Sequence, residues 1–129
     1  MTKLFCDIAD INLIKKFNRK KIVQGFTTNP TLMRKAGAKN YIEYCKKILK
    51  EINNKPVSFE VFADNPKNII KQALKITNLG KNVYVKIPVT NSKGIFLGKT
   101  IKELNNRNIK LNITAVYTAK QTLKILKNI

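Results

Sequence analysis

The stretch Val-Tyr-Val-Lys-Ile-Pro, residues 83–88, places a lysine in the middle of an otherwise apolar strand pattern. Side chains alternate between the two faces of a β-strand, so the two valines and Ile87 share one face while Tyr84 and Lys86 share the other. In a parallel sheet covered by helices both faces are normally apolar, and a lysine inside such a strand therefore needs a particular environment. The fold and the chemistry of the chain both follow from what surrounds this strand.

The same strand pattern recurs four more times along the chain, and a helical pattern follows each strand. The other strands are expected over residues 3–7, 25–28, 57–62 and 111–116. Apolar residues at helical spacing are expected to form helices over residues 10–17, 41–52, 64–77, 94–106 and 118–126. Alternating strands and helices of this length form parallel sheets. The sequence predicts five βα units and one domain over residues 1–129.

Several of these strands carry polar residues on one face. Side-chain alternation puts Glu60 on the same strand face as Ser58, and Asp7 on the same face as Phe5. In the last strand, Asn112 and Thr114 alternate with apolar neighbours. Two architectures fit the order of elements: an open doubly wound sheet, or part of a (β/α)8 barrel. The first would bury these polar groups against helices, which costs several kcal/mol for each unpaired group. A TIM barrel collects them inside, near its catalytic rim. The expected fold is therefore α/β, a partial (β/α)8 TIM barrel of about five units with outer helices, its C-terminal units missing.

A lysine inside a partly apolar barrel suggests chemistry at its amine. Desolvation disfavours an ammonium, so the amine of Lys86 becomes available to attack a carbonyl and form a Schiff base. Asp7 and Glu60 would then move protons, while Asn29, Asn112 and Thr114 would fix hydroxyls or a water molecule. The site needs no metal and no cofactor. The alternative interpretation makes Lys86 a solvated lysine of an edge strand, and Asp7 and Asn29 helix caps.

Composition limits the other functions open to the chain. The 129 residues carry a formal net charge of +19 and no histidine, which excludes histidine-based catalysis, and the two cysteines do not have zinc-site spacing. Of the 26 basic residues 23 are Lys, whereas specific nucleic-acid recognition favours Arg. A basic nucleic-acid-binding module stays open as an alternative, with weak binding that ignores sequence. No stretch is long and apolar enough for a membrane span, and the N-terminus lacks a signal-peptide pattern, so we expect a soluble, cytoplasmic protein.

At these same residues the chain resembles the transaldolases, in particular the small subfamily that includes the fructose-6-phosphate aldolases. The segment Phe-Cys-Asp at residues 5–7 looks like the family's first strand, and Gly-Phe-Thr-Thr-Asn-Pro-Thr-Leu at 25–32 like its GxTTNPSL signature. Residues 83–88 resemble its VxVKIP strand, and Asn-Ile-Thr at 112–114 the NxT of its fifth strand. The order of these segments agrees over the whole chain.

The resemblance implies a role for each site residue. Lys86 would form the Schiff base with C2 of a ketose phosphate, and Asp7 would take the proton of the C4 hydroxyl. Glu60 would move protons through a water molecule held with Thr114. The implied substrate-binding residues are Thr28, Asn29 and Asn112. The implied activity is transfer of a dihydroxyacetone unit from fructose 6-phosphate or sedoheptulose 7-phosphate to an aldose phosphate in the pentose phosphate pathway.

The sequence also departs from the family pattern. The chain stops at Ile129, before the sixth strand that brings the family's phosphate-binding arginine, and it carries Glu60 where the fructose-6-phosphate aldolases carry Gln. Glu60 favours a transaldolase over an aldolase-type lyase. We expect the 129 residues alone to have weak or no activity, and to form homo-oligomers or pair with a complementary C-terminal fragment. A catalytically dead barrel fragment remains an alternative.

Overall fold

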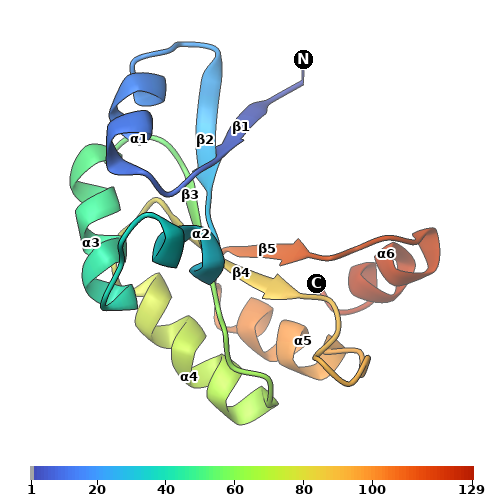
Figure 1. The fold of residues 1–129 in the computed structure, drawn as a ribbon. Helices are drawn as coiled ribbons and strands as arrows, with labels where there is room; N and C mark the ends of the chain where they lie inside the picture. Colours follow the sequence, from blue (N-terminus) through green and yellow to red (C-terminus); the bar gives the residue numbers. More distant parts are fainter. Residues whose placement is uncertain (1) are drawn as a thin grey trace.

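The computed structural model describes residues 2–129, in which five strands alternate with helices (Figure 1). The strands are β1 (Leu4–Asp7), β2 (Val23–Thr27), β3 (Val57–Glu60), β4 (Val83–Pro88) and β5 (Leu111–Thr114). The helices are α1 (Ile11–Asn18), α2 (Pro30–Lys35), α3 (Tyr41–Glu51), α4 (Pro66–Thr77), α5 (Gly98–Asn106) and α6 (Ala119–Leu126). Each expected strand is present.

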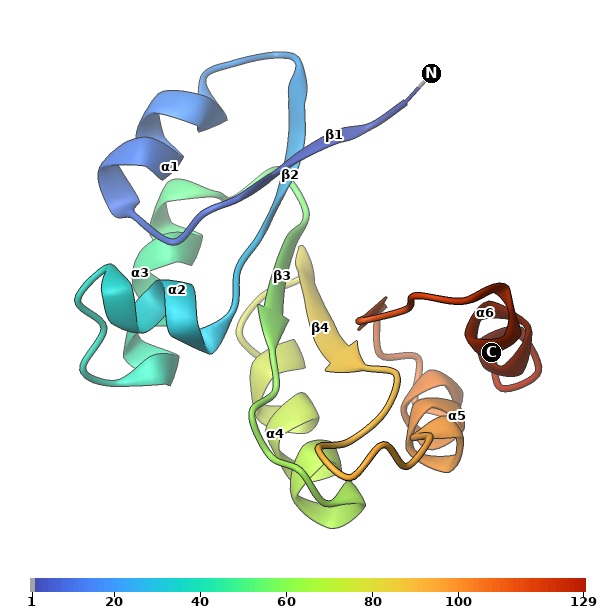
Figure 2. The same ribbon diagram turned by 45° about the vertical axis from the view of Figure 1, so that its right-hand side comes forward.

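The five strands form one parallel sheet in the order β1-β2-β3-β4-β5. The sheet curls, and α1, α3, α4 and α5 follow one another along its convex side (Figures 1 and 2). Each strand therefore lies beside its predecessor in sequence, which is the strand order of a (β/α) barrel and not of a doubly wound sheet. The expected partial barrel is confirmed, and its concave face is the one that collects the polar residues.

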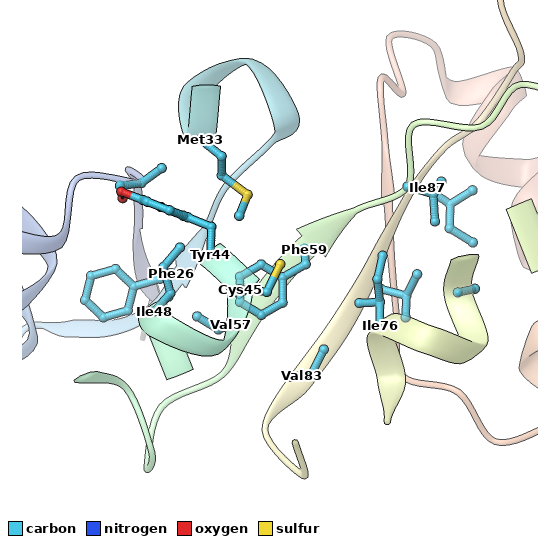
Figure 3. Close-up of a cluster of buried hydrophobic side chains, with 14 of the residues drawn as sticks. Phe26, Met33, Tyr44, Cys45, Ile48, Val57, Phe59, Ile76, Val83 and Ile87 are labelled. Atoms are coloured by element: carbon cyan, nitrogen blue, oxygen red, sulfur yellow. The ribbon is translucent and has the colours of Figure 1, made fainter. Parts of the chain in front are cut away.

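The hydrophobic core lies between the convex face of the sheet and the helices (Figure 3). Phe26, Phe59 and Ile87 project from β2, β3 and β4 and are almost fully buried. Cys45 and Ile48 of α3 lie beside Phe26 and Phe59, and Ile76 of α4 lies on the side of Ile87 (Figure 3). Burial raises the pKa of the Cys45 thiol to about 12, so this cysteine remains a protonated core residue.

Side-chain caps fix where most helices begin. Asp10, Asn65 and Thr118 accept hydrogen bonds from the first turns of α1, α4 and α6. The longest of these helices, α4, has 12 residues. Within residues 2–129, no helix has the length and apolar character needed to cross a bilayer.

The structure differs from the sequence-based expectation in several places. Strand β2 begins at Val23 and not at residue 25, and β3 ends at Glu60 and not at residue 62. Helix α2 was not among the expected helices; Asn29 caps it and Pro30 begins it. Helix α5 begins at Gly98 and not at residue 94, since a turn with Gly94 at φ +74° and a bridge between Thr90 and Phe96 come first. Strand β5 ends at Thr114 because the next residue, Ala115, has a left-handed φ of +57°.

Candidate active site

The polar side chains of the concave face lie in successive rows across the sheet. Strand register places Asp7 beside Thr27, Thr27 beside Ser58, and Ser58 beside Tyr84. Two residues nearer the carboxyl ends of the strands, a second row contains Glu60, Lys86 and Asn112. Thr114 lies two residues beyond Asn112 along β5, opposite Pro88 of β4. The parity predicted from the sequence thus brings the expected residues of β1, β3, β4 and β5 onto one face.

Lys86 occupies the middle of the second row and pairs with Glu60. Its Nζ lies 3.5 Å from Glu60 Oε2 and 3.5 Å from the main-chain oxygen of Thr28, both long contacts. Only 13% of the Lys86 side chain and 20% of the Glu60 side chain are exposed. The interpretation of Lys86 as a solvated edge lysine is therefore wrong, because β4 is an inner strand and its lysine is mostly enclosed.

The surroundings of Glu60 shift the pKa of its carboxyl. Burial raises the pKa of its carboxyl above the ordinary value, and the negative charge of Asp7 adds to this effect, whereas the Lys86 ammonium and its hydrogen bond act in the opposite direction. Burial is the largest of these influences, so the pKa of Glu60 is raised overall. A carboxyl with a raised pKa beside an amine suits general acid–base work.

Asp7 is bound by a residue that the sequence analysis did not single out. The hydroxyl of Thr27 donates to Asp7 Oδ1 at 2.8 Å, across the β1–β2 pair. Thr27 lies on the concave face together with Gly25, where the ring of Phe5 leaves no room for a Cβ. Strand alternation in the 25–28 segment was the signal that could have identified Thr27.

Asn112 and Thr114 have different surroundings on β5. The Asn112 amide donates to Ser58 Oγ at 3.0 Å, which links the second row to the first across the intervening strand β4. Thr114 makes no side-chain hydrogen bond to the described residues, 2–129, and is partly exposed. The hydroxyl of Thr114 is thus open to a water molecule or a ligand on the same face as Glu60.

Thr28 and Asn29 are not part of the two polar rows on the concave face. Thr28 has the parity of Phe26, its side chain is only 2% exposed, and its hydroxyl is 3.5 Å from the main-chain oxygen of Asn29. Asn29 Oδ1 accepts the N–H of Leu32 at 2.9 Å and caps α2. The capping interpretation of Asn29 is correct, whereas Asp7 caps no helix because Asp10 performs that function for α1.

The carboxylates of the site are spread over different strands. Among residues 2–129, no three His, Cys, Asp or Glu side chains gather closely enough to hold a metal ion. On its concave surface the site offers a ligand an amine, two carboxyls, the Asn112 amide and several hydroxyls. A hollow of about 370 Å³ on this surface is lined by residues that include Phe5, Tyr84 and Asn112.

Comparison with known proteins gives a consistent result. The family model described as transaldolase/fructose-6-phosphate aldolase matches residues 4–129. A probable transaldolase of Sulfurihydrogenibium sp. (strain YO3AOP1) is 40% identical over 125 residues, and one of Thermoplasma volcanium is 41% identical over 128 residues. These matches cover 97% and 98% of this chain and 55% of each relative, so the chain spans about half the length of the curated relatives it matches. The chain belongs to the transaldolase/fructose-6-phosphate aldolase family.

Proposed function

We propose that this chain carries the Schiff-base half of a transaldolase, with Lys86 as the nucleophile. The donor is a ketose phosphate, either fructose 6-phosphate or sedoheptulose 7-phosphate, and the acceptor is an aldose phosphate. The observation that carries the proposal is the enclosed pair of Lys86 and Glu60, 3.5 Å apart on the concave face, with Asp7 on the same face. Family membership supports the same chemistry.

The first step is attack of the Lys86 amine on C2 of the ketose. The carbon–nitrogen bond forms as the carbonyl oxygen takes up a proton, and loss of that oxygen as water leaves an imine. Glu60 is the group placed to give and take these protons, since its raised pKa lets it hold a proton more readily than an ordinary carboxyl. Thr114 would hold the water that passes them on.

The second step breaks the bond between C3 and C4. Asp7 accepts the proton of the C4 hydroxyl, the C3–C4 electron pair moves into the protonated imine, and the aldose phosphate leaves. The dihydroxyacetone unit stays on Lys86 as an enamine. It then adds to the aldehyde carbon of the acceptor, and hydrolysis of the new imine releases the product and restores the amine of Lys86.

Borohydride reduction tests the assignment of Lys86. The 129-residue chain is incubated with fructose 6-phosphate and sodium borohydride, which reduces the imine to a stable secondary amine, and peptide mass spectrometry locates the adduct. We expect the adduct on Lys86. Label scattered over many of the other lysines, or an adduct that persists without Lys86, contradicts the proposal.

Two matched variants sharpen this test. Lys86→Arg keeps a cation beside Glu60 but cannot form an imine, so trapping is lost without loss of the charge pair. Lys110→Arg makes the same change at a lysine whose Nζ donates to the main-chain oxygen of Lys81 at 2.7 Å, and trapping should continue. Equal loss of trapping in both variants would point to an effect on folding and not to the chemistry of Lys86.

The fate of the enamine separates transaldolase from an aldolase-type lyase. With erythrose 4-phosphate present, a transaldolase passes the three-carbon unit on and forms sedoheptulose 7-phosphate, whereas a lyase releases free dihydroxyacetone. Glu60 supports the first outcome, because the lyases that the chain resembles carry Gln at this place. Release of dihydroxyacetone at the rate of cleavage would assign the chain to the lyases.

Activity of the 129 residues by themselves is proposed to be weak. Within residues 2–129, β1 and β5 each pair on one side only, and Asp7 is exposed at that open side. Open parallel edges favour association, so we propose pairing with other copies or with a chain that supplies further βα units. Mass in solution, measured together with turnover, tests both statements; an active monomer contradicts them.

A further inference from the structure

The hydrogen-bond ladder between β2 and β3 stops one step short of Glu60. The N–H groups of Phe26 and Thr28 donate to the main-chain oxygens of Pro56 and Ser58 at 2.9 and 3.1 Å. A parallel ladder repeats every two residues, so the next donor would be the N–H of residue 30 and the next acceptor the oxygen of Glu60. Residue 30 is proline, which has no N–H. The main-chain oxygen of Glu60 therefore needs another donor.

The hydroxyl of Tyr41 supplies this donor from the outer layer. It lies at the start of α3 and donates to the Glu60 main-chain oxygen at 2.7 Å. Burial, followed by the neighbouring Cys45 and Glu60, raises the pKa of the Tyr41 phenol, so the hydroxyl keeps the proton that it donates. The Tyr41 ring also packs edge-on against Phe62, with the ring centres 5.4 Å apart.

The peptide group between Glu60 and Val61 is thus held at both ends. Its oxygen accepts from Tyr41 and its N–H donates to the main-chain oxygen of Lys86 at 3.0 Å. Just beyond it, Gln72 of α4 accepts the N–H groups of Phe62 and Ala63 at 3.0 and 2.9 Å. Side chains from two helices therefore fix the main chain at the point where β3 leaves the sheet.

From this arrangement we infer that Tyr41 is a positioning residue: it replaces the ladder donor that Pro30 lacks and so holds Glu60 against Lys86. The positioning of Glu60 by Tyr41 does not depend on the proposed function. Its effect on catalysis does rest on the proposed function. The groups around the Glu60 carboxyl are Lys86 of β4, Asp7 of β1 and Arg34 of α2, which shares a rim groove with Glu60. Tyr41 contacts none of the proposed reacting atoms.

Tyr44 provides a matched control on the same helix. Its hydroxyl also donates to main-chain oxygens, those of Ala9 at 3.0 Å and Ala36 at 3.3 Å, and its side chain is buried. Tyr41→Phe and Tyr44→Phe each remove one phenolic hydroxyl, which takes the donor from one main-chain oxygen in the first variant and from two that share it in the second. A merely structural effect would be similar in the two variants, with a cost of roughly one hydrogen bond each.

The first measurement is independent of catalysis. The carboxyl carbons of glutamate are labelled with ¹³C, the Glu60 signal is identified by its loss in Glu60→Gln, and its titration midpoint is followed by NMR. We expect Tyr41→Phe to lower the midpoint toward that of an ordinary glutamate, because a loosened Glu60 gains water. Tyr44→Phe should leave it unchanged. The same midpoint in the wild type and both variants overturns the inference.

A second measurement covers the case in which Tyr41→Phe does not fold. In the unaltered chain the hydroxyl proton of Tyr41 should exchange slowly with water and give its own NMR signal, since it is held in a 2.7 Å hydrogen bond. A rapidly exchanging hydroxyl overturns the inference.

The catalytic consequence is tested by the trapping rate. At saturating fructose 6-phosphate we expect Tyr41→Phe to slow adduct formation on Lys86 by about tenfold and Tyr44→Phe to change it little. Tenfold is less than the loss of roughly 100-fold or more expected when a proton-transfer group is itself removed, because Glu60 is loosened and not deleted. If the wild type forms no adduct, the proposed function fails while the titration of Glu60 still decides the role of Tyr41. If the adduct forms equally fast in both variants, the proposed function stands and the positioning role is wrong.

Discussion

Thr27 and Asp7 are joined by a hydrogen bond of 2.8 Å between neighbouring strands, with the threonine hydroxyl as donor and the aspartate carboxylate as acceptor. Asp7 is otherwise exposed at the edge strand β1. The bond therefore fixes the direction of a carboxylate that would otherwise be free to rotate, and it leaves the second carboxylate oxygen for the proton transfer proposed for Asp7.

Removal of this hydroxyl should affect the cleavage step alone. Thr27→Val keeps the shape of the side chain and deletes the donor, at a stability cost of about 1 kcal/mol or less because the pair is exposed. We expect imine trapping on Lys86 to continue at the wild-type rate while release of glyceraldehyde 3-phosphate slows. Trapping and release that fall by the same factor would show that Thr27 does not act through Asp7.

The raised pKa of Glu60 predicts how stability depends on pH. The folded chain holds a proton on Glu60 more tightly than the unfolded chain, so the folded state binds more protons between the two pKa values. Its free energy of unfolding should therefore fall as the pH rises from the ordinary glutamate pKa to the raised one. Urea unfolding of the wild type and of Glu60→Gln over this range measures the effect, because the glutamine variant lacks this component. If the difference in unfolding free energy between the wild type and Glu60→Gln does not change with pH, the raised pKa of Glu60 is contradicted.

Asp64 fastens the loop that follows β4. Its carboxylate accepts both the N–H and the hydroxyl of Ser92 at 2.7 Å, and these bonds lower the pKa of Asp64, the N–H bond most. A carboxyl whose pKa is lowered by folding stabilises the folded state at pH values above its ordinary pKa. That stabilisation is lost as the pH falls through the lowered pKa. Asp64→Ala should speed amide exchange at Ser92 several-fold but leave Leu13, which Asp10 caps, unchanged. Equal protection of Ser92 in both chains would count against the loop contact.

Two phenylalanines three residues apart should differ sharply in their contribution to stability. Phe59 is fully buried between β3 and the helices, whereas Phe62 is 62% exposed just beyond the strand. Phe59→Ala should cost roughly 3–5 kcal/mol, because it opens a cavity in the core. Phe62→Ala should cost about 0.5 kcal/mol or less, as at most surface positions. Denaturant unfolding of the two variants measures both values, and comparable losses would mean that the core is misplaced.

The sequence predicted the barrel because polar residues of one parity occur in strand after strand. Lys86 and Glu60 are separated by 26 positions, yet period-2 alternation and the parallel order put them in adjacent strands of one row. Side-chain alternation alone could not predict the role of Tyr41. That role depends on the main-chain oxygen of Glu60, which receives no ladder hydrogen bond because residue 30 is proline. Thr28 illustrates the opposite case, since its place in a motif predicted substrate binding, whereas its parity is that of Phe26 and the residue is buried.

The missing N–H of Pro30 at the end of the β2–β3 hydrogen-bond ladder limits how the sequence can evolve. The proline at position 30 offers no N–H, and the hydroxyl at position 41 supplies the donor in its place, so position 41 is not free to vary while position 30 is proline. A residue with an N–H at position 30 would lift this constraint and release position 41 to any side chain that fits against Phe62. Among descendants of this sequence, a proline at position 30 should therefore be accompanied by a hydroxyl at position 41, although the two side chains belong to different helices.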